Sequence, residues 1–146
     1  MIYLGADHAG FKLKEKIKQY FEKHSISYAD LGAQDFDKDD DYTDYAVMVA
    51  KKVSLEPKAR GILICGTGNG MAMAANKIKS VRAALAWDVY SAEKATEDDH
   101  ANIITLPARD ISHRRAIKVI KAYLDAKPSK ASSHIRRINK IKKLEK

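Results

Sequence analysis

Short apolar segments alternate with amphipathic segments along the chain, and this alternation limits the possible folds more than any other feature. The segments typical of strands are residues 1–5, 28–31, 61–65, 81–87 and 102–106. The segments with helical spacing are residues 11–24, 45–53, 71–78, 91–98 and 112–124. Residues 61–65, GILIC, are apolar throughout, as in a strand that is covered on both faces. The alternation predicts an α/β fold with a doubly wound, mainly parallel, five-stranded sheet.

Pro128 ends this pattern and separates a domain of residues 1–127 from a C-terminal tail of residues 128–146. The tail is predicted to be an amphipathic helix, because apolar side chains recur every three residues at Ile135, Ile138, Ile141 and Leu144. Residues 127–146 carry eight Lys or Arg and one Glu, a net charge of +7 out of +8 for the whole chain. Such a basic tail can meet nucleic acid, a phosphorylated ligand or an acidic partner surface, or it is simply a solvated helix face.

The composition argues against several classes of protein. A single cysteine excludes an internal disulfide framework and fits a reducing cytoplasm. It also leaves too few thiolates for a structural zinc site, and the five histidines show no HxxxH spacing. No apolar run approaches the roughly 20 residues that span a bilayer. We therefore expect a cytoplasmic protein with no thiolate zinc site and no membrane segment.

A glycine-rich loop follows the apolar segment 61–65, and the cysteine stands at its mouth. The loop reads CGTGNG, so glycine occupies every second position after Cys65. Ligands of doubly wound folds bind at the carboxyl ends of the strands, where this loop should lie. Glycine lets several backbone N–H groups point inward, and the helix that follows adds its positive end. A thiolate would be stabilised there, so Cys65 is either a base or nucleophile or a small buried residue at a strand end.

Two further segments carry polar side chains next to predicted strands. GADHAG at residues 5–10 places Asp7 and His8 at a carboxyl end, where they could bind a polyol or an anion, or act as a helix cap beside a surface histidine. EDDHAN at residues 97–102 contains three acids and His100, and we expect it near another part of the same edge, unless it is a solvated helix end.

Arginine and tyrosine supply the remaining candidates. Guanidinium groups bind phosphate in bidentate geometry, and the candidates are Arg109, Arg136 and Arg137. Tyr42 and Tyr45 in DYTDYA could cover a sugar, although packing of a helix explains at least one of them more simply.

Taken together, these segments resemble the ribose-5-phosphate isomerase B family of sugar-phosphate isomerases. The resemblance runs in order through GADHAGFKLKEKI, DYTDYA, GILICGTGNGMAMAANKI, VRAAL and YSA…ANIITLPAR. It implies a Rossmann-like fold, a homodimer or dimer of dimers, and no metal or organic cofactor. It also implies isomerisation of ribose 5-phosphate and ribulose 5-phosphate through a cis-enediolate.

The resemblance also implies roles for individual residues. Cys65 would be the base and Thr67 the hydroxyl beside it, while the backbone N–H groups of residues 66–70 would hold the enediolate charge. That loop comprises Gly66, Thr67, Gly68, Asn69 and Gly70. Some relatives have serine at the cysteine position and a glutamate directly after the loop as base. Here that position is Met71, which cannot take a proton, so the role falls to Cys65.

The chain departs from the family pattern in two places. The family commonly has a His–Asn pair in this segment, of which the histidine helps to open the furanose ring, and the matching residues here are Asp98 and Asp99. Either Asp98 takes over this step, or His100 does, or ring opening is unassisted.

The second departure concerns phosphate. Of two family arginines four residues apart, the first is Ser133 and only Arg137 remains, so Arg136 or Lys130 would have to compensate. Arg109 matches a further phosphate ligand of the family. The family also implies that the tail packs on a partner subunit and that two chains share the site.

Three functions remain open at this stage. The leading one is isomerisation of ribose 5-phosphate. The second is isomerisation of a six-carbon or four-carbon aldose phosphate, since pocket shape sets the sugar length. The third is a non-catalytic binder of a phosphorylated ligand or nucleic acid. Cys65 and Thr67 in an intact anion-binding loop favour an enzyme acting on a small sugar phosphate rather than a nucleic-acid binder.

Overall fold

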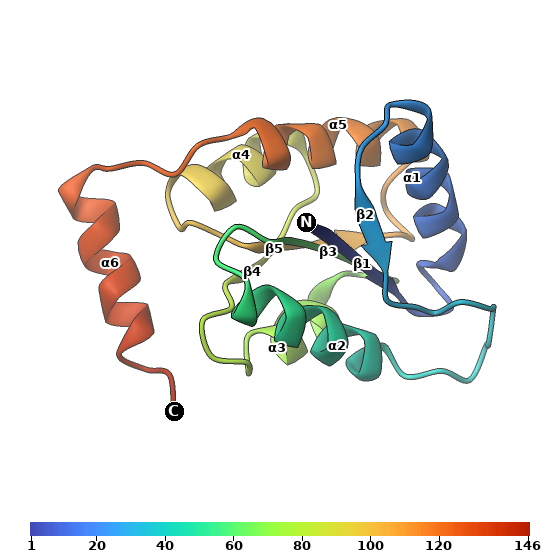
Figure 1. The fold of residues 1–146 in the computed structure, drawn as a ribbon, viewed down its shortest axis with the longest axis horizontal. Coiled ribbons are helices and arrows are strands. Elements are labelled where there is room, and N and C mark those ends of the chain that lie inside the picture. The colour runs from blue at the N-terminus through green and yellow to red at the C-terminus, as the bar shows by residue number, and fades with distance from the viewer.

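The computed structural model describes all residues, 1–146, and shows a parallel sheet between two layers of helices (Figure 1). The strands are β1 (Ile2–Ala6), β2 (Tyr28–Asp30), β3 (Arg60–Cys65), β4 (Ala83–Leu85) and β5 (Ile103–Pro107). The helices are α1 (Phe11–Lys23), α2 (Tyr42–Leu55), α3 (Asn69–Ala75), α4 (Val89–Glu97), α5 (His113–Asp125) and α6 (Ser132–Lys142). This is the Rossmann-like arrangement of the predicted α/β class, and every strand pair is parallel.

The strand order β2-β1-β3-β5-β4 places a topological switch point between β1 and β3. From β1 the chain first adds β2 on one side, and it later adds β3 on the other. The loops that leave β1 and β3 therefore diverge, which opens a crevice at their carboxyl ends. The register pairs Ala6 with Ile64, so Asp7, directly after β1, lies at the same height as Cys65, the last residue of β3.

Both faces of the sheet are covered, which explains why the central strands lack polar alternation. Leu4, Ile62 and Ile104 pack on one face against α1, α4 and α5, and all three are fully buried. Leu63 and Ile103 pack on the opposite face against α2 and α3. Each such side chain contributes about 1.5–3 kcal/mol by its removal from water, so the two cores fix the strand ends that carry the loops.

The predicted elements are confirmed with shifted boundaries. The helix expected over residues 45–53 begins three residues earlier at Tyr42, because Asp41 adopts the extended conformation of an N-cap. That start is what brings Tyr42 to the carboxyl edge of the sheet. The strand expected over residues 81–87 is only Ala83–Leu85, since it lies at the sheet edge and pairs with β5 alone.

The last helix, α6, lies beyond the β4 edge of the sheet and is joined to α5 by an extended segment (Figure 1). Of its apolar stripe only Ile138 is buried, while Ile135, Ile141 and Leu144 are exposed by 38%, 44% and 80%. The tail thus leaves most of its apolar stripe uncovered within one chain. No helix of the protein has both the length and the apolar character needed to cross a bilayer.

Candidate active site

A cavity of about 210 Å³ lies at the carboxyl ends of β1, β3 and β5. It is lined by Asp7, His8, Ala9, Tyr42, Cys65, Gly66, Thr67, Gly70 and Arg109. Four segments far apart in the sequence thus converge where the strand order predicts a ligand site. A larger hollow of about 630 Å³ between α4 and α5 is lined mainly by charged side chains and contains none of the candidate catalytic residues.

Cys65 is the last residue of β3, and its thiol lies under the glycine-rich loop. The residue is 4% exposed, and its Sγ accepts a hydrogen bond of 3.2 Å from the backbone N–H of Gly68. Gly68 has a φ of +79°, and a Cβ at that position would lie 2.5 Å from Leu85 Cδ1, so the position requires glycine. A backbone dipole aimed at the sulfur stabilises negative charge on it, which suits a thiolate base.

The other two glycines of the loop allow side chains to approach its backbone closely. A Cβ on Gly66 would lie 2.7 Å from the guanidinium Nη1 of Arg109, and one on Gly70 would lie 2.5 Å from Cζ of Tyr42. The loop is therefore covered by two side chains from different elements, Tyr42 at the start of α2 and Arg109 after β5. Asn69 begins α3 on the exposed side and donates its N–H to Thr67 Oγ1 at 3.3 Å.

Gly70→Ala tests whether the Tyr42 ring is part of the site. The added methyl group must displace the ring, and we expect kcat/KM for the substrate to fall by roughly tenfold, since small displacements of positioning groups are costly. The matched control is the same change in a Tyr42→Ala background. There Gly70→Ala should cost almost nothing further, and equal losses in both backgrounds would show that the methyl group acts on something other than the tyrosine.

Asp7 follows β1 and is 5% exposed. Its Oδ1 accepts a hydrogen bond of 3.1 Å from the N–H of Gly10, and burial raises the pKa of the carboxyl group above its ordinary value. A Cβ on Gly10 would lie 2.3 Å from the carbonyl oxygen of Ile64, so this loop is pressed against β3. Asp7 thus orders the loop and lines the cavity, but the interpretation of Asp7 as a helix cap is wrong, because the N-cap of α1 is Gly10 and no side chain caps that helix.

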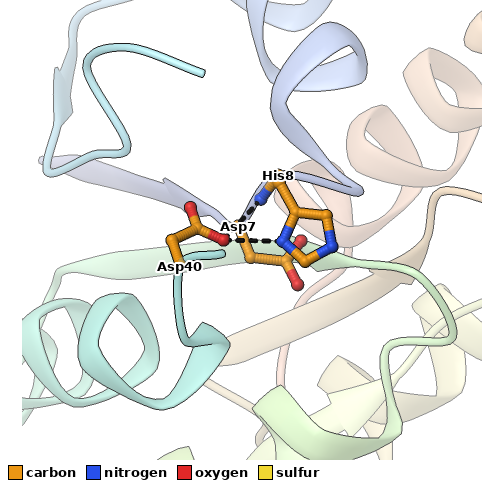
Figure 2. Close-up of side chains that lie close together, drawn as sticks. All are labelled: Asp7, His8 and Asp40. Atoms are coloured by element: carbon orange, nitrogen blue, oxygen red, sulfur yellow. Dashed lines mark hydrogen bonds and ion pairs between the residues drawn. The ribbon is translucent and has the colours of Figure 1, made fainter. Parts of the chain in front are cut away.

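His8 is held by Asp40, a residue from the acidic loop before α2. One carboxylate oxygen of Asp40, Oδ1, accepts from the backbone N–H of His8 at 2.9 Å and lies 2.7 Å from its ring Nδ1 (Figure 2). The hydrogen bond to Asp40 raises the pKa of His8 above its ordinary value. Asp7, His8 and Asp40 each offer one nitrogen or oxygen atom, and these three atoms lie within 4.8 Å of one another, which is close enough for a shared cation. However, Nδ1 of His8 is already engaged by Asp40.

Asp40 is the one residue of this cluster that the sequence did not single out. It is one of five aspartates between residues 35 and 41, and nothing in their spacing distinguishes it. Its role depends on a contact between residues 32 positions apart. Only the tertiary fold reveals such a contact.

Arg109 is carried by the loop after β5 and is tied to the cysteine loop. The N–H of Arg109 donates to the carbonyl of Gly66 at 3.0 Å, and that of Ala108 donates to the carbonyl of Cys65 at 2.8 Å. These bonds extend the sheet ladder beyond the strands. They hold a guanidinium, which is a good phosphate ligand, at the mouth of the cavity.

The segment 97–102 lies at the opposite edge of the sheet, so the expectation that it lies near the carboxyl edge is wrong. It joins α4 to β5 and therefore delivers the chain to the amino end of β5, where Asn102 accepts from the N–H of Gly61 at the start of β3. A five-residue strand is about 16 Å long. Asp98, Asp99 and His100 thus do not line the cavity of their own chain.

This segment is instead bound to the tail. His100 Nε2 lies 2.8 Å from the carbonyl oxygen of Ser129, and Arg82 donates to the carbonyls of Asp99 and His100 at 2.9–3.2 Å. Asp98 Oδ1 lies 3.6 Å from His134 Nε2. Arg136 and Arg137 on α6 are exposed and also lie outside the cavity.

Comparison with known proteins adds to this geometry. The ribose/galactose isomerase family matches residues 2–141. The ribose-5-phosphate isomerase B of Mycolicibacterium paratuberculosis is 38% identical over 138 residues, which cover 94% of this chain and 87% of that protein.

Solved structures agree over the full length. A crystal structure of ribose-5-phosphate isomerase B from Mycoplasma genitalium with bound ribulose 5-phosphate has a TM-score of 0.92 and 40% identity, covering 97% of this chain and 93% of that one. The ribose-5-phosphate isomerase from Thermotoga maritima has a TM-score of 0.93 and 37% identity, covering 98% and 97%. The similarity therefore includes both the sheet and the tail.

Proposed function

The chain belongs to the ribose/galactose isomerase family, and we propose that it interconverts ribose 5-phosphate and ribulose 5-phosphate with Cys65 as the base. The observation that carries the assignment of the base is the Cys65 sulfur, which lines the cavity and accepts an N–H from its own glycine loop. Cys65 is the only thiol of the chain, and Thr67 and Asp7, which also line the cavity, offer oxygen atoms in its place.

The reaction moves one carbonyl group between C1 and C2. The Cys65 thiolate removes the proton from C2 of the open-chain aldose, and the electron pair forms the C1–C2 double bond of a cis-enediolate. The same thiol then returns the proton to C1, while a proton passes from the C2 oxygen to the C1 oxygen. The N–H groups of residues 66–70 hold the negative charge on oxygen, and the Thr67 hydroxyl serves the oxygen-to-oxygen transfer.

The remaining lining residues fit the two ends of a sugar phosphate. Asp7, whose pKa is raised by burial, can share a proton with a sugar hydroxyl, and Tyr42 covers the sugar. Arg109 and His8 supply positive charge for the phosphate. This division matches the substrate class that the sequence predicted.

We propose that a second copy of the chain completes the site. Four candidate residues do not line the cavity of their own chain and lie instead at the amino edge or on the tail: Asp98, Asp99, Arg136 and Arg137. A homodimer, or a dimer of dimers, would bring them to the cavity of the partner. The exposed stripe of α6 supplies apolar surface for such an interface.

Within the segment 97–102 we propose Asp98, and not His100, as the group that opens the ring. His100 is already engaged by the Ser129 carbonyl, whereas the Asp98 side chain is 37% exposed and makes only the long contact with His134. A carboxylate can exchange the proton of an anomeric hydroxyl group.

Asp98→Asn should lower kcat/KM for ribose 5-phosphate by at least about tenfold, because a general acid–base group is lost. A four-carbon aldose phosphate that cannot form a furanose should be affected little. His100→Asn is the comparison variant, and it should weaken docking of the tail rather than discriminate between the substrates. Equal losses on both substrates for Asp98→Asn would instead identify Asp98 as a structural residue.

A panel of aldose phosphates with four, five and six carbons tests the substrate itself. We expect the highest kcat/KM for ribose 5-phosphate. Faster turnover of a six-carbon or four-carbon substrate would show that the chain is an isomerase of that aldose phosphate and not of ribose 5-phosphate. Binding of all of them without turnover would support the non-catalytic alternative.

A further inference from the structure

The carboxylate of Asp40 lies beside Nδ1 of the His8 imidazole, and the Tyr45 side chain of α2 also faces it. The side chain of Asp40 is 5% exposed, and Oδ1 accepts from both the backbone N–H and the ring of His8. The second oxygen, Oδ2, is buried and takes no hydrogen bond. A buried carboxylate charge is costly unless it is paired, so a cation on His8 is the partner that compensates it.

We propose that Asp40 is a positioning residue that holds His8 as an imidazolium, with Nδ1–H on the carboxylate and Nε2–H free to donate to the phosphate of the substrate. The phosphate comes from the proposed function, on which this inference rests. Asp40 itself touches no substrate. It acts through the orientation and the charge of His8.

The geometry supports this arrangement in two ways. Two contacts to one oxygen fix the backbone and the ring of His8 together, so the imidazole cannot turn over without losing one of them. The Nε2 atom points away from Asp40 (Figure 2). A histidine bound at Nδ1 by a carboxylate has its tautomer and orientation set, and its charged form is stabilised.

The charged groups around His8 shift its pKa in opposite directions. Asp40 is the main cause of its raised pKa, Asp7 at the end of β1 adds to the rise, and Arg109 after β5 opposes it. Tyr45 on α2 faces Asp40, and burial together with the Asp40 charge raises the pKa of its hydroxyl, so it stays neutral. Cys65 and Tyr42 line the same cavity.

The charge of His8, and with it the binding of phosphate, should depend on pH. Because the pKa of His8 is raised, its positive charge is fully present below the ordinary value near 6.5 and is lost as the pH rises through the raised value. Without the Asp40 charge, the loss should begin at lower pH. Phosphate binding should therefore weaken selectively at neutral and alkaline pH.

Asp40→Asn is the variant that tests this, because asparagine keeps the size and one acceptor oxygen but removes the charge. We expect KM for ribose 5-phosphate, and the inhibition constant of inorganic phosphate, to rise roughly tenfold at pH 8 and to stay close to wild type at pH 5.5, with kcat little changed. Asp40→Glu should restore part of the affinity. Asp39→Asn removes the neighbouring exposed charge and should leave the profile unchanged.

The titration of the His8 imidazole, followed by NMR and assigned with His8→Gln, gives a readout independent of turnover. Its pKa should fall in Asp40→Asn and stay unchanged in Asp39→Asn. An unchanged His8 titration overturns the inference. So does a loss of kcat with unchanged KM at every pH, which would indicate a merely structural role.

The same measurements separate this inference from the proposed function. If the wild type turned over no aldose phosphate, the proposed function would fail, yet the His8 titration and the binding of inorganic phosphate would still test the role of Asp40. If the wild type is active but the two variants at residues 39 and 40 behave alike, the proposed function stands and the role of Asp40 is wrong.

Discussion

Cys65→Ala is expected to lower kcat by about 10²–10⁴-fold while the affinity for ribose 5-phosphate changes little. A base that acts on the C2 proton stabilises the transition state and makes no strong contact with the ground state. Alanine removes one small buried group and the sulfur that accepts from the Gly68 N–H, while the other N–H groups of the glycine loop should remain in place. The measurement is kcat by a coupled assay together with the dissociation constant by calorimetry.

Exchange of the substrate C2 proton sharpens this test. With deuterium at C2, the wild type should show a slowed reaction and wash-out of the label into solvent, and the alanine variant should show no wash-out above background. A variant that keeps more than about a tenth of wild-type kcat would remove Cys65 from the role of base. A parallel fall in affinity and thermal stability would point to disruption of the loop instead.

The fold could be predicted because apolar strand segments alternate with amphipathic helical segments, and because the central strand β3 is buried on both faces. Residues 61–65 are apolar throughout, as expected of a central strand, and the glycine loop directly after them made Cys65 a candidate site residue. The GADHAG segment was recognisable for the same reason, since Asp7 and His8 follow a strand. In both cases the chemistry-bearing residue lies next to the element that positions it, so local pattern and tertiary position agree.

The segment 97–102 was placed at the wrong edge because its composition does not indicate at which end of the strands a loop lies. A loop that leads from a helix into a parallel strand lies at the amino end of the sheet, as the contact of Asn102 with Gly61 shows. Its polar residues resemble those of the carboxyl-end loops although they lie at the other edge. The choice between Asp98 and His100 also depends on the path of the tail, through the contact of His100 with Ser129.

Asp40 could not be identified from the sequence for a different reason. Five aspartates compete in one short loop, and the local pattern favours none of them. The contact with His8 forms only because α2 and the loop after β1 both pack beside the carboxyl end of β3. Contacts between residues so far apart in the sequence depend on the topology of the fold, so they cannot be inferred from the local pattern of a single sequence.

The tail offers the second large expected effect, through Ile135→Glu combined with Ile141→Glu. Both side chains are more than a third exposed within one chain, so charges there should not disturb the domain itself. In the proposed dimer these side chains would be buried, and each would contribute up to about 1.5–3 kcal/mol to the interface. We therefore expect a monomer by light scattering.

The same double variant should lose at least about 10²-fold in kcat/KM, because Asp98 and Arg137 of a second copy would no longer reach the cavity and positioned groups are worth that much. Lys140→Ala with Lys143→Ala is the matched control, since it changes the net charge by the same amount on the exposed face of the helix end. It should remain dimeric and active. Dilution of the wild type should reproduce the loss of activity at the concentration where the dimer dissociates, because the site depends on assembly. An unchanged oligomer with unchanged KM in the double glutamate variant would show that the apolar stripe of the tail does not form the interface, and the proposal that the tail of a second copy completes the site would be wrong.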